Sequence, residues 1–370
     1  MHQKKIIFAI DQLGMGGAEN MIVQQVNHID RKIFKVYLIT LFSNPKVNVA
    51  DKIDPDVTYV QFNFRSPFSG LLDISSWWRL YKFFRKEKFD VVDTNLFITN
   101  IIVRIVAIFA GVPVILSNEL NVYKNKKYWQ ICIDKILARF TKVIFASSSE
   151  VLEFTAEQEH LSKDKFCLNY NAIPLKLFKV KENRNKVLTE FALPTDSFYI
   201  VTAGRLIVQK GHKYLLEAAQ ILKKQGISNF KVLIFGQGVL EEEISKQIIS
   251  LGLEYQVKLM GLSSMDNILA ISDTFVLPSL WEGLSIALLQ AMDSGSVIVA
   301  TDISGSREAI INGTSGLVVS SGDSEKLASA LSTVMKDTQL RTKLSRGALE
   351  QVKKFSIEAN VKIIEREALK

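Results

Sequence analysis

Short apolar runs alternate with longer amphipathic stretches along most of this 370-residue chain. Apolar runs without polar alternation are typical of strands buried on both faces of a parallel sheet. The stretches between them repeat their apolar residues with a helical period. The pattern therefore predicts a parallel α/β architecture in which helices cover the faces of each sheet.

The strand candidates form two series. The first series comprises residues 5–10, 35–40, 57–62, 90–95, 113–118 and 142–147. The second series comprises residues 198–204, 231–236, 257–261, 274–279, 296–301 and 316–320. Between them, the segment from Lys179 to Thr195 is polar and is predicted to be a linker. We expect two doubly wound, Rossmann-like domains in tandem, with ligands at the carboxyl ends of the strands.

The composition is that of a globular protein, with 48% hydrophobic and 23% charged residues. Cys132 and Cys167 are too few for a disulfide framework, so we expect a reducing cytoplasm. The apolar run at residues 5–10 is too short for a signal peptide, and the region 96–116 is interrupted by polar residues. We therefore expect neither a targeting signal nor a membrane-spanning helix.

The net charge of +8 is unevenly distributed. Residues 1–180 hold 24 lysines and arginines against 17 acidic residues, whereas residues 181–370 hold 22 against 21. A basic first half indicates an anionic partner, which could be membrane lipid, a phosphorylated acceptor or nucleic acid. Nucleic acid is disfavoured because no recognised binding module accompanies the charge.

Two segments of the basic half, residues 75–88 and 124–140, combine cations with aromatic residues. As helices they could lie on an anionic membrane, or their apolar faces could pack on the sheet. We expect that their apolar faces pack partly on the sheet and that the helices also associate with the membrane. The residues predicted to contact the acceptor or the membrane are Trp77, Trp78, Lys126 and Lys127.

Three glycine-containing stretches follow strand candidates. In LGMGGAEN (13–20), Gly16 and Gly17 would let a ligand approach the backbone at a helix start, although a simple tight turn explains them equally well. In GRLIVQKGH (204–212), Arg205 and Lys210 could flank a diphosphate or could be solvated surface charges. The stretch around Gly236 repeats the strand–glycine–helix order.

A fourth stretch, SLWEGLSIALLQAMDSGS (279–296), begins a predicted helix just after Glu282. The carboxylate can accept hydrogen bonds from sugar hydroxyls, and the backbone amides of residues 283–285 can point at a phosphate or sugar. Gln290 follows eight residues after Glu282 on the same predicted helix.

The order LGxGGAE, GRLxxxKG, FGxG, EG(x)6QAM, TDxxGxxE and NGxxG resembles retaining glycosyltransferases of the GT-B fold, in particular the bacterial family-4 enzymes that use nucleotide sugars. The likeness covers nearly the whole chain and is strongest from Gly204 to Gly316. It implies two Rossmann-like domains facing a central cleft. Residues 1–180 would bind the acceptor, with a C-terminal helix at 355–370 crossing back to them, and residues 196–354 would bind the donor.

The resemblance also implies roles for particular residues. Arg205 and Lys210 would neutralise the departing diphosphate, and Glu282 would hold hydroxyls of the donor sugar. Gln290, where the family usually has glutamate, would contact the ribose. The other donor contacts implied are Gly16, Gly17, Gly204, Gly236, Gly283, Leu284 and Ser285. No metal is required by such enzymes, and Asp54-Pro55-Asp56, which has the letters of a metal-binding DxD, is predicted to be a turn.

The implied activity is transfer of a sugar, with retention, from a UDP- or GDP-linked donor to a glycan or polyprenyl-diphosphate-linked acceptor in bacterial surface polysaccharide synthesis. The enzyme would be cytoplasmic and peripheral on the inner face of the plasma membrane. The family often has histidines where this chain has Asp93, Asn95 and Leu120. Two alternatives stay open: a catalytically silent protein that binds nucleotide sugars or acts as a scaffold, and a nucleotide-sugar 2-epimerase.

Overall fold

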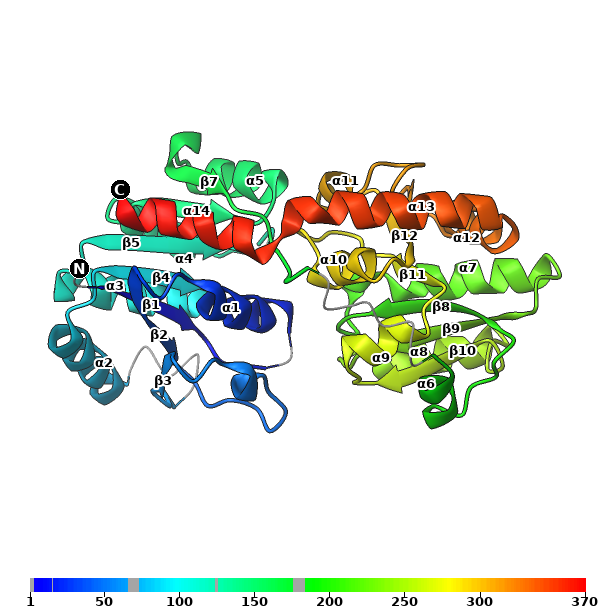
Figure 1. Ribbon diagram of the computed structural model, residues 1–370, viewed down its shortest axis with the longest axis horizontal. Coiled ribbons are helices and arrows are strands. Elements are labelled where there is room, and N and C mark those ends of the chain that lie inside the picture. Colours follow the sequence, from blue (N-terminus) through cyan, green and yellow to red (C-terminus); the bar gives the residue numbers. More distant parts are fainter. Residues whose placement is uncertain (1–2, 15, 66–72, 124–125, 176–183) are drawn as a thin grey trace. The chain divides into compact units, whose positions relative to one another are not determined.

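The computed structural model describes the chain except for residues 1–2, 15, 66–72, 124–125 and 176–183 (Figure 1). It divides into two compact units. Unit 1 consists of residues 1–173 and 357–370, and unit 2 consists of residues 174–356. Among the described residues, no helix is both long enough and apolar enough to cross a membrane.

Unit 1 is built on a parallel sheet of seven strands in the order β3-β2-β1-β4-β5-β6-β7. Its strands are β1 (Lys4–Ile10), β2 (Phe34–Thr40), β3 (Thr58–Gln61), β4 (Val91–Asn95), β5 (Val114–Glu119), β6 (Val143–Ala146) and β7 (Phe166–Leu168). The strand order reverses between β1 and β4, so the loops that follow these two strands meet at a topological switch point. Six of the seven strands were predicted from their apolar runs, but the three-residue β7 was not.

Helices cover both faces of this sheet. They are α1 (Gly17–His28), α2 (Ile74–Glu87), α3 (Phe97–Ala110), α4 (Tyr128–Ala138), α5 (Ser149–Glu159) and α14 (Ile357–Leu369). Helices α2, α3, α4 and α5 contact one another in sequence, whereas α1 contacts α14 (Figure 1). Right-handed crossovers place α1 on one face and α2 to α5 on the other.

The segment that contains α14 is tied to unit 1 by backbone and side-chain hydrogen bonds. The Ile357 amide donates to the Ile173 carbonyl at 2.9 Å. Asn360 donates through Nδ2 to the Tyr170 carbonyl at 2.8 Å and accepts from Gln25 Nε2 at 3.1 Å. Asn360 is 4% exposed, so these bonds satisfy an amide that would otherwise be buried without partners.

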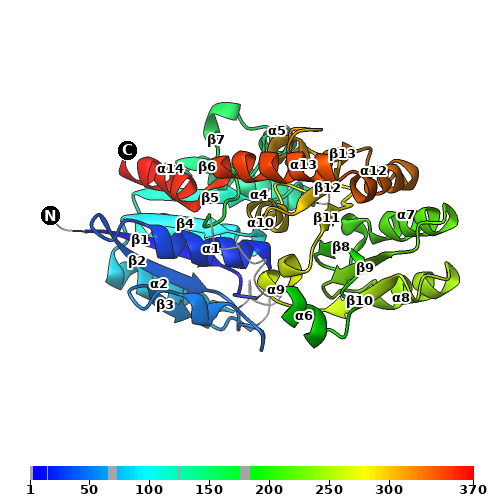
Figure 2. The same ribbon diagram turned by 45° about the vertical axis from the view of Figure 1, so that its right-hand side comes forward.

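Unit 2 has a parallel six-stranded sheet in the order β10-β9-β8-β11-β12-β13 (Figure 2). The strands are β8 (Phe198–Ala203), β9 (Phe230–Phe235), β10 (Val257–Gly261), β11 (Thr274–Leu277), β12 (Val297–Thr301) and β13 (Leu317–Val319). The helices are α6 (Arg184–Glu190), α7 (His212–Lys224), α8 (Glu241–Ser250), α9 (Met265–Ala270), α10 (Ile286–Asp293), α11 (Ser304–Ala309), α12 (Ser324–Lys336) and α13 (Thr338–Gln351). The switch point of this sheet lies between β8 and β11.

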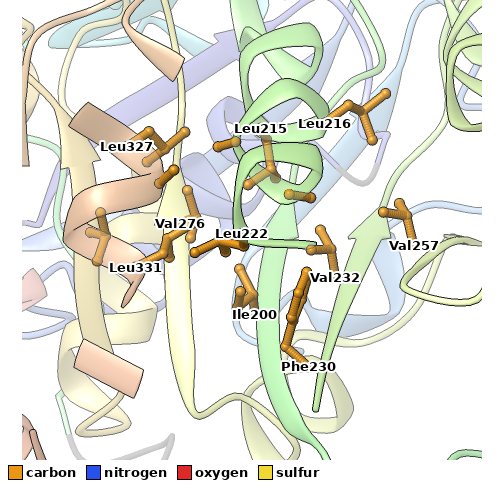
Figure 3. Close-up of a cluster of buried hydrophobic side chains, with 14 of the residues drawn as sticks. Ile200, Leu215, Leu216, Leu222, Phe230, Val232, Val257, Val276, Leu327 and Leu331 are labelled. Atoms are coloured by element: carbon orange, nitrogen blue, oxygen red, sulfur yellow. The ribbon is translucent and has the colours of Figure 1, made fainter. Parts of the chain in front are cut away.

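One core of unit 2 lies between the sheet and helices α7 and α12 (Figure 3). Leu215 and Leu222 of α7 are fully buried, as are Ile200 and Phe230 of the sheet and Leu331 of α12. Burying one such side chain contributes about 1.5–3 kcal/mol relative to leaving it in water. This packing fixes α7, and therefore the loop that connects β8 to it.

The predicted linker is wrong for the part that the structure describes. Residues Arg184–Glu190 form helix α6, and its Val187 and Leu188 are buried in a second core of unit 2. Two adjacent apolar residues in a polar run were too weak a signal of helical periodicity. Residues 179–183 of the predicted linker lie outside the described residues.

Candidate active site

The loops after β8 and β11 bring together residues that are far apart in the sequence. Lys210 follows β8, Glu282 follows β11, and the Lys210 ammonium forms an ion pair with Glu282 Oε1. The Ser279 hydroxyl donates to Glu282 Oε2 at 2.9 Å. The Lys210 and Glu282 side chains are 13% and 16% exposed, so the pair is largely shielded from water yet open to a ligand.

Backbone contacts hold these two loops against each other. The Leu280 amide donates to the Gln209 carbonyl at 2.8 Å, and Gln209 Nε2 donates to the Trp281 carbonyl at 2.9 Å. Gly211 has a φ of +62°, and a Cβ added to it would lie 2.0 Å from the Pro278 carbonyl oxygen. A side chain at position 211 would therefore push the two loops apart.

Gly204 and Gly236 form the floor beside Lys210. A Cβ on Gly204 would lie 3.2 Å from Lys210 Cε, so the lysine side chain crosses directly over this glycine. Gly236 has a φ of +141°, and its added Cβ would lie 1.9 Å from the Gly204 carbonyl oxygen. The packing of the strand ends thus requires glycine at position 236, whereas at position 204 a side chain would meet only the flexible Lys210 side chain.

Arg205 is exposed, and its guanidinium makes no hydrogen bond or ion pair with the residues that the structure describes. His212 Nε2 lies 3.3 Å from the Arg205 carbonyl oxygen and must donate to it, because a carbonyl only accepts. Burial lowers the pKa of His212 to about 4, so this imidazole is neutral at neutral pH. His212 was assigned no role from the sequence, yet it orients the backbone that carries Arg205.

The residues that follow Glu282 lead directly into α10. Gly283, Leu284 and Ser285 are buried, and Ser285 is the N-cap of the helix. A Cβ on Gly305 of α11 would lie 2.1 Å from the Gly283 carbonyl oxygen, so α11 packs tightly against this turn. Gln290 is partly exposed on α10. The structure therefore places these residues on one continuous loop and helix beside Lys210.

Gly16 and Gly17 belong to unit 1, where both are exposed and Gly17 is the first residue of α1. A Cβ on Gly16 would lie 2.3 Å from Glu19 Oε2. A carboxylate therefore lies against the glycine that was predicted to face a diphosphate, and Glu19 would have to turn away to admit one. The sequence reasoning did not consider Glu19.

Lys126, which was predicted to contact the acceptor or the membrane, has a side chain that is 4% exposed, and this burial does not fit contact with a membrane. Its ammonium lies 3.0 Å from Asp134 Oδ2, 2.6 Å from Glu159 Oε1 and 3.7 Å from Glu119 Oε1. Arg104 Nη2 contacts Asp134 Oδ1 at 2.6 Å. We call these five residues the buried ionic cluster. Its members come from separate elements, so the sequence alone did not show that Lys126 has partners.

The other predicted surface contacts differ in exposure. Trp77 packs against the core of unit 1, whereas Trp78 is 54% exposed and Lys127 is exposed. The Asp54-Pro55-Asp56 stretch forms a turn, as predicted, with the Val57 amide donating to the Asp54 carbonyl at 2.9 Å. Within the described part of the chain, no group of three or more histidine, cysteine or acidic residues could hold a metal ion.

Two sequence families match this chain. Residues 15–177 match the family described as Glycosyltransferase Family 4, and residues 183–351 match the family described as Glycosyl transferases group 1. The first match lies in unit 1 except for its last few residues, and the second lies within unit 2. The glycine motif at residues 13–20 therefore lies in the unit that matches the first family, and the motifs from Gly204 to Gly316 lie in the unit that matches the second.

Curated relatives are similar over most of their length. The Campylobacter jejuni N-acetylgalactosamine-N,N'-diacetylbacillosaminyl-diphospho-undecaprenol 4-alpha-N-acetylgalactosaminyltransferase is 29% identical, with 100% of this chain and 99% of the relative covered. The Escherichia coli UDP-Gal:alpha-D-GlcNAc-diphosphoundecaprenol alpha-1,3-galactosyltransferase is 28% identical, with 88% of this chain and 86% of the relative covered.

Solved structures share the fold. Anabaena HepE in complex with UDP and glucose superimposes with a TM-score of 0.84 at 19% identity, covering 98% of this chain and 99% of HepE. A glycosyltransferase from Rickettsia africae superimposes with a TM-score of 0.83 at 18% identity over the whole of both chains. The two family matches and the curated relatives, together with the two parallel sheets, lead to one conclusion: the chain belongs to the family-4-like glycosyltransferases and has the GT-B fold.

Proposed function

We propose that this enzyme transfers a hexosyl or N-acetylhexosaminyl group, with retention, from a UDP-linked donor to a polyprenyl-diphosphate-linked sugar in bacterial surface polysaccharide synthesis. The names of the two curated relatives support a lipid-linked acceptor, and that of the E. coli relative supports a UDP donor. The observation that carries the proposal is the Lys210–Glu282 pair at the switch point of unit 2. Ligands of doubly wound sheets bind at such points.

The chemistry follows from the charges at this site. The bond from the anomeric carbon to the diphosphate breaks, and a bond to the acceptor oxygen forms on the same face of the sugar. The departing diphosphate oxygen takes the proton of the acceptor hydroxyl, so no protein base is needed. Arg205 and Lys210 stabilise the negative charge that develops on the diphosphate. This reaction needs no metal, because the two cations supply the electrostatic stabilisation.

The Lys210–Glu282 ion pair is compatible with donor binding. A lysine ammonium has three donors, so one can bind Glu282 while the others bind phosphate oxygens. Glu282 is held by Lys210 and Ser279, and its remaining lone pairs can accept hydrogen bonds from hydroxyls of the donor sugar. The pair therefore supports a phosphate site next to a sugar site.

The test is a panel of UDP-sugars, assayed for transfer to a short polyprenyl-diphosphate sugar and for hydrolysis without acceptor. Arg205→Ala and Lys210→Ala should each lower kcat at least about 100-fold, since removing one preorganised charge donor costs about 3–4 kcal/mol. Lys213→Ala is the matched control, because Lys213 is 65% exposed and forms an exposed i,i+4 pair with Glu217. Chelation of divalent cations should leave the rate unchanged. Near-wild-type turnover in both site variants would contradict the assignment.

We also propose that unit 1 binds anionic membrane through the outer surface of α2, α3 and α4, which we call the basic aromatic face. Seven large apolar side chains are exposed there: Ile74, Trp78, Phe109, Tyr128, Trp129, Ile136 and Phe140. The exposed cations of the same surface are Arg79, Lys82, Arg85, Lys86, Lys88, Lys127, Lys135 and Arg139.

The acidic residues of these helices do not offset that charge. Asp134 is buried, and Glu87 pairs with Lys5. The neighbouring α5 exposes Glu150, Glu153 and Glu157, so the positive surface ends at α5. Aromatic and apolar side chains interspersed with cations are suited to the interface of an anionic bilayer.

Vesicle sedimentation tests this surface. Vesicles with anionic lipid should bind the protein, and raised salt should release part of it because exposed charges are screened. A Trp78→Ser/Trp129→Ser variant should bind more weakly. Tyr255→Ser, which removes a 72% exposed aromatic residue of unit 2, should not. Equal binding to anionic and neutral vesicles would contradict the proposal.

A further inference from the structure

Two asparagines lie side by side at the carboxyl edge of the unit 1 sheet. Asn95 of β4 and Asn118 of β5 are direct register partners. Asp93, two residues before Asn95 and on the same face of the sheet, accepts from both: from Asn95 Nδ2 at 2.8 Å and from Asn118 Nδ2 at 2.6 Å. β4 is one of the two strands at the switch point of this sheet.

This arrangement fixes the orientation of both amides. Both Nδ2 groups donate to Asp93 Oδ1, and Asn118 Nδ2 also donates to the Thr94 carbonyl at 3.2 Å, so each Oδ1 faces the other way. Neither Oδ1 accepts a hydrogen bond from the described residues, although the two side chains are nearly enclosed, with the residues 3% and 4% exposed. The edge of the sheet thus presents two acceptor oxygens, and no described residue donates a hydrogen bond to either of them.

Asp93 is an unusual residue to bury. It is 0% exposed, and its Oδ2 has no hydrogen-bond partner among the described residues. Burial raises its pKa to about 7, because nothing of opposite charge compensates for the lost hydration. An unsatisfied buried polar atom destabilises a fold, so Asp93 is not explained by stability.

The same edge carries further signs of a built site. Asn100 Oδ1, Ser147 Oγ and Asn169 Oδ1 are also buried without partners in the described chain, and they lie near or after the ends of β4, β6 and β7. Leu96, immediately after Asn95, has φ 69° and ψ 154°, a conformation that a residue with a side chain rarely adopts. The chain therefore accepts backbone strain at the residue that ends β4.

We propose that Asn95 and Asn118 form a pair that recognises sugar hydroxyls, with Asp93 as the residue that positions them; this rests on the proposed glycosyltransferase function. Each Oδ1 accepts a hydrogen bond from a ring hydroxyl of the substrate. Two acceptors beside a buried carboxyl repel a phosphate and suit a neutral, hydroxyl-rich ring. The pair determines which sugar is accepted and takes no part in bond breaking.

The sugar could be that of the donor or that of the acceptor, and one set of assays separates them. Asn95→Leu and Asn118→Leu should each raise KM about tenfold or more for the substrate that they contact, with a smaller change in kcat. If the donor sugar is contacted, acceptor-free hydrolysis of the donor changes in parallel. If the acceptor sugar is contacted, hydrolysis is unchanged and only transfer is affected.

Deoxy analogues give the decisive measurement. A substrate lacking the contacted hydroxyl should react poorly with the wild type but should suffer no further loss with the matching Asn→Leu variant, because both changes remove the same bond. Asp93→Asn should reduce discrimination between the parent and deoxy sugars at Asn95, whose amide is then free to turn over, and less at Asn118, whose Nδ2 also donates to the Thr94 carbonyl.

Thr94→Val is the matched control for packing damage. Its hydroxyl donates to the Leu116 carbonyl at 3.2 Å on the opposite face of the sheet, so this variant should keep normal discrimination. If both Asn→Leu variants retain the wild-type melting temperature and still discriminate among all deoxy sugars as the wild type does, the inference is wrong. Failure of the proposed function would be seen separately, as a wild type that neither transfers nor hydrolyses any UDP-sugar.

Discussion

Replacing Lys126 by methionine should destabilise unit 1, because this lysine is the only group that touches all three carboxylates of the buried ionic cluster among the described residues. Methionine has a similar length but no charge. The variant leaves Glu119, Asp134 and Glu159 with Arg104 as the one remaining cation of the cluster, and of these three carboxylates Arg104 pairs with Asp134 alone.

The expected magnitude follows from burial. The Lys126, Asp134 and Glu159 side chains are 4%, 3% and 2% exposed, so water cannot replace the lost partner. Breaking a buried pair by removing one partner costs about 3–5 kcal/mol. At about 2–4 °C per kcal/mol for a domain of this size, the melting temperature of unit 1 should fall by about 6–20 °C.

The loss should depend on pH in a defined direction. Burial already raises the pKa of Glu119 from 4.5 to about 7 with Lys126 present, and removing the lysine raises it further. When the pKa of a carboxyl is higher in the folded state than in the unfolded state, the fold becomes less stable as the pH rises from the unfolded-state pKa to the folded-state pKa. The deficit of Lys126→Met should therefore be larger at pH 8 than at pH 5.

Thermal unfolding followed by near-UV circular dichroism at both pH values measures this. Lys127→Met is the matched control, since the adjacent Lys127 is exposed. A melting temperature within about 2 °C of wild type at pH 8, or equal deficits at pH 5 and pH 8, would refute the reasoning.

Substitutions at two further positions test the donor site. Gln290→Glu should change donor KM several-fold with a smaller change in kcat, because ribose contacts contribute mainly to uniform binding. Gln290→Ala should raise donor KM by the equivalent of about 1 kcal/mol. If donor affinity stays within twofold of wild type in both variants, Gln290 does not contact the ribose. Gly236→Ala should lower both stability and turnover, since its Cβ would lie 1.9 Å from the Gly204 carbonyl oxygen. Gly226→Ala is the control, because a Cβ there meets nothing within 4 Å and the variant should show only the modest cost of its positive φ. Equal effects of the two alanines, measured by thermal unfolding and steady-state kinetics, would count against a packing role for Gly236.

Much of the fold could be predicted because a parallel sheet buried on both faces requires continuous apolar runs. Phe230–Phe235 and Val297–Thr301 are both fully buried, and both were found from the sequence within one residue. The three-residue β7 carries too few positions for a periodicity, and α6 hides its buried Val187 and Leu188 among polar residues. Short elements of this kind are defined by their tertiary contacts.

The site was harder to predict than the fold. Arg205 and Lys210 lie in one glycine-bounded motif, but the pairing of Lys210 with Glu282 joins loops that are remote in sequence and rests on the adjacency of β8 and β11. Asp93 was noted only as a departure from the family pattern, since nothing in its neighbourhood shows that Asn118 donates to it. The burial of Lys126 was missed for the same reason: its partners come from other elements.

The return of α14 to unit 1 has a consequence for folding during synthesis. The ribosome produces residues 1–173, then all of unit 2, and only afterwards the helix that contacts α1. Domains generally fold as they emerge, so the continuous unit 2 can complete its core first, while α1 and the backbone of Tyr170 wait for Asn360. The first unit to be translated is therefore the second to be finished, and chaperones would meet its uncovered α1 surface in nascent chains. Deleting α14 would leave that α1 surface uncovered in the half of the protein that was translated first.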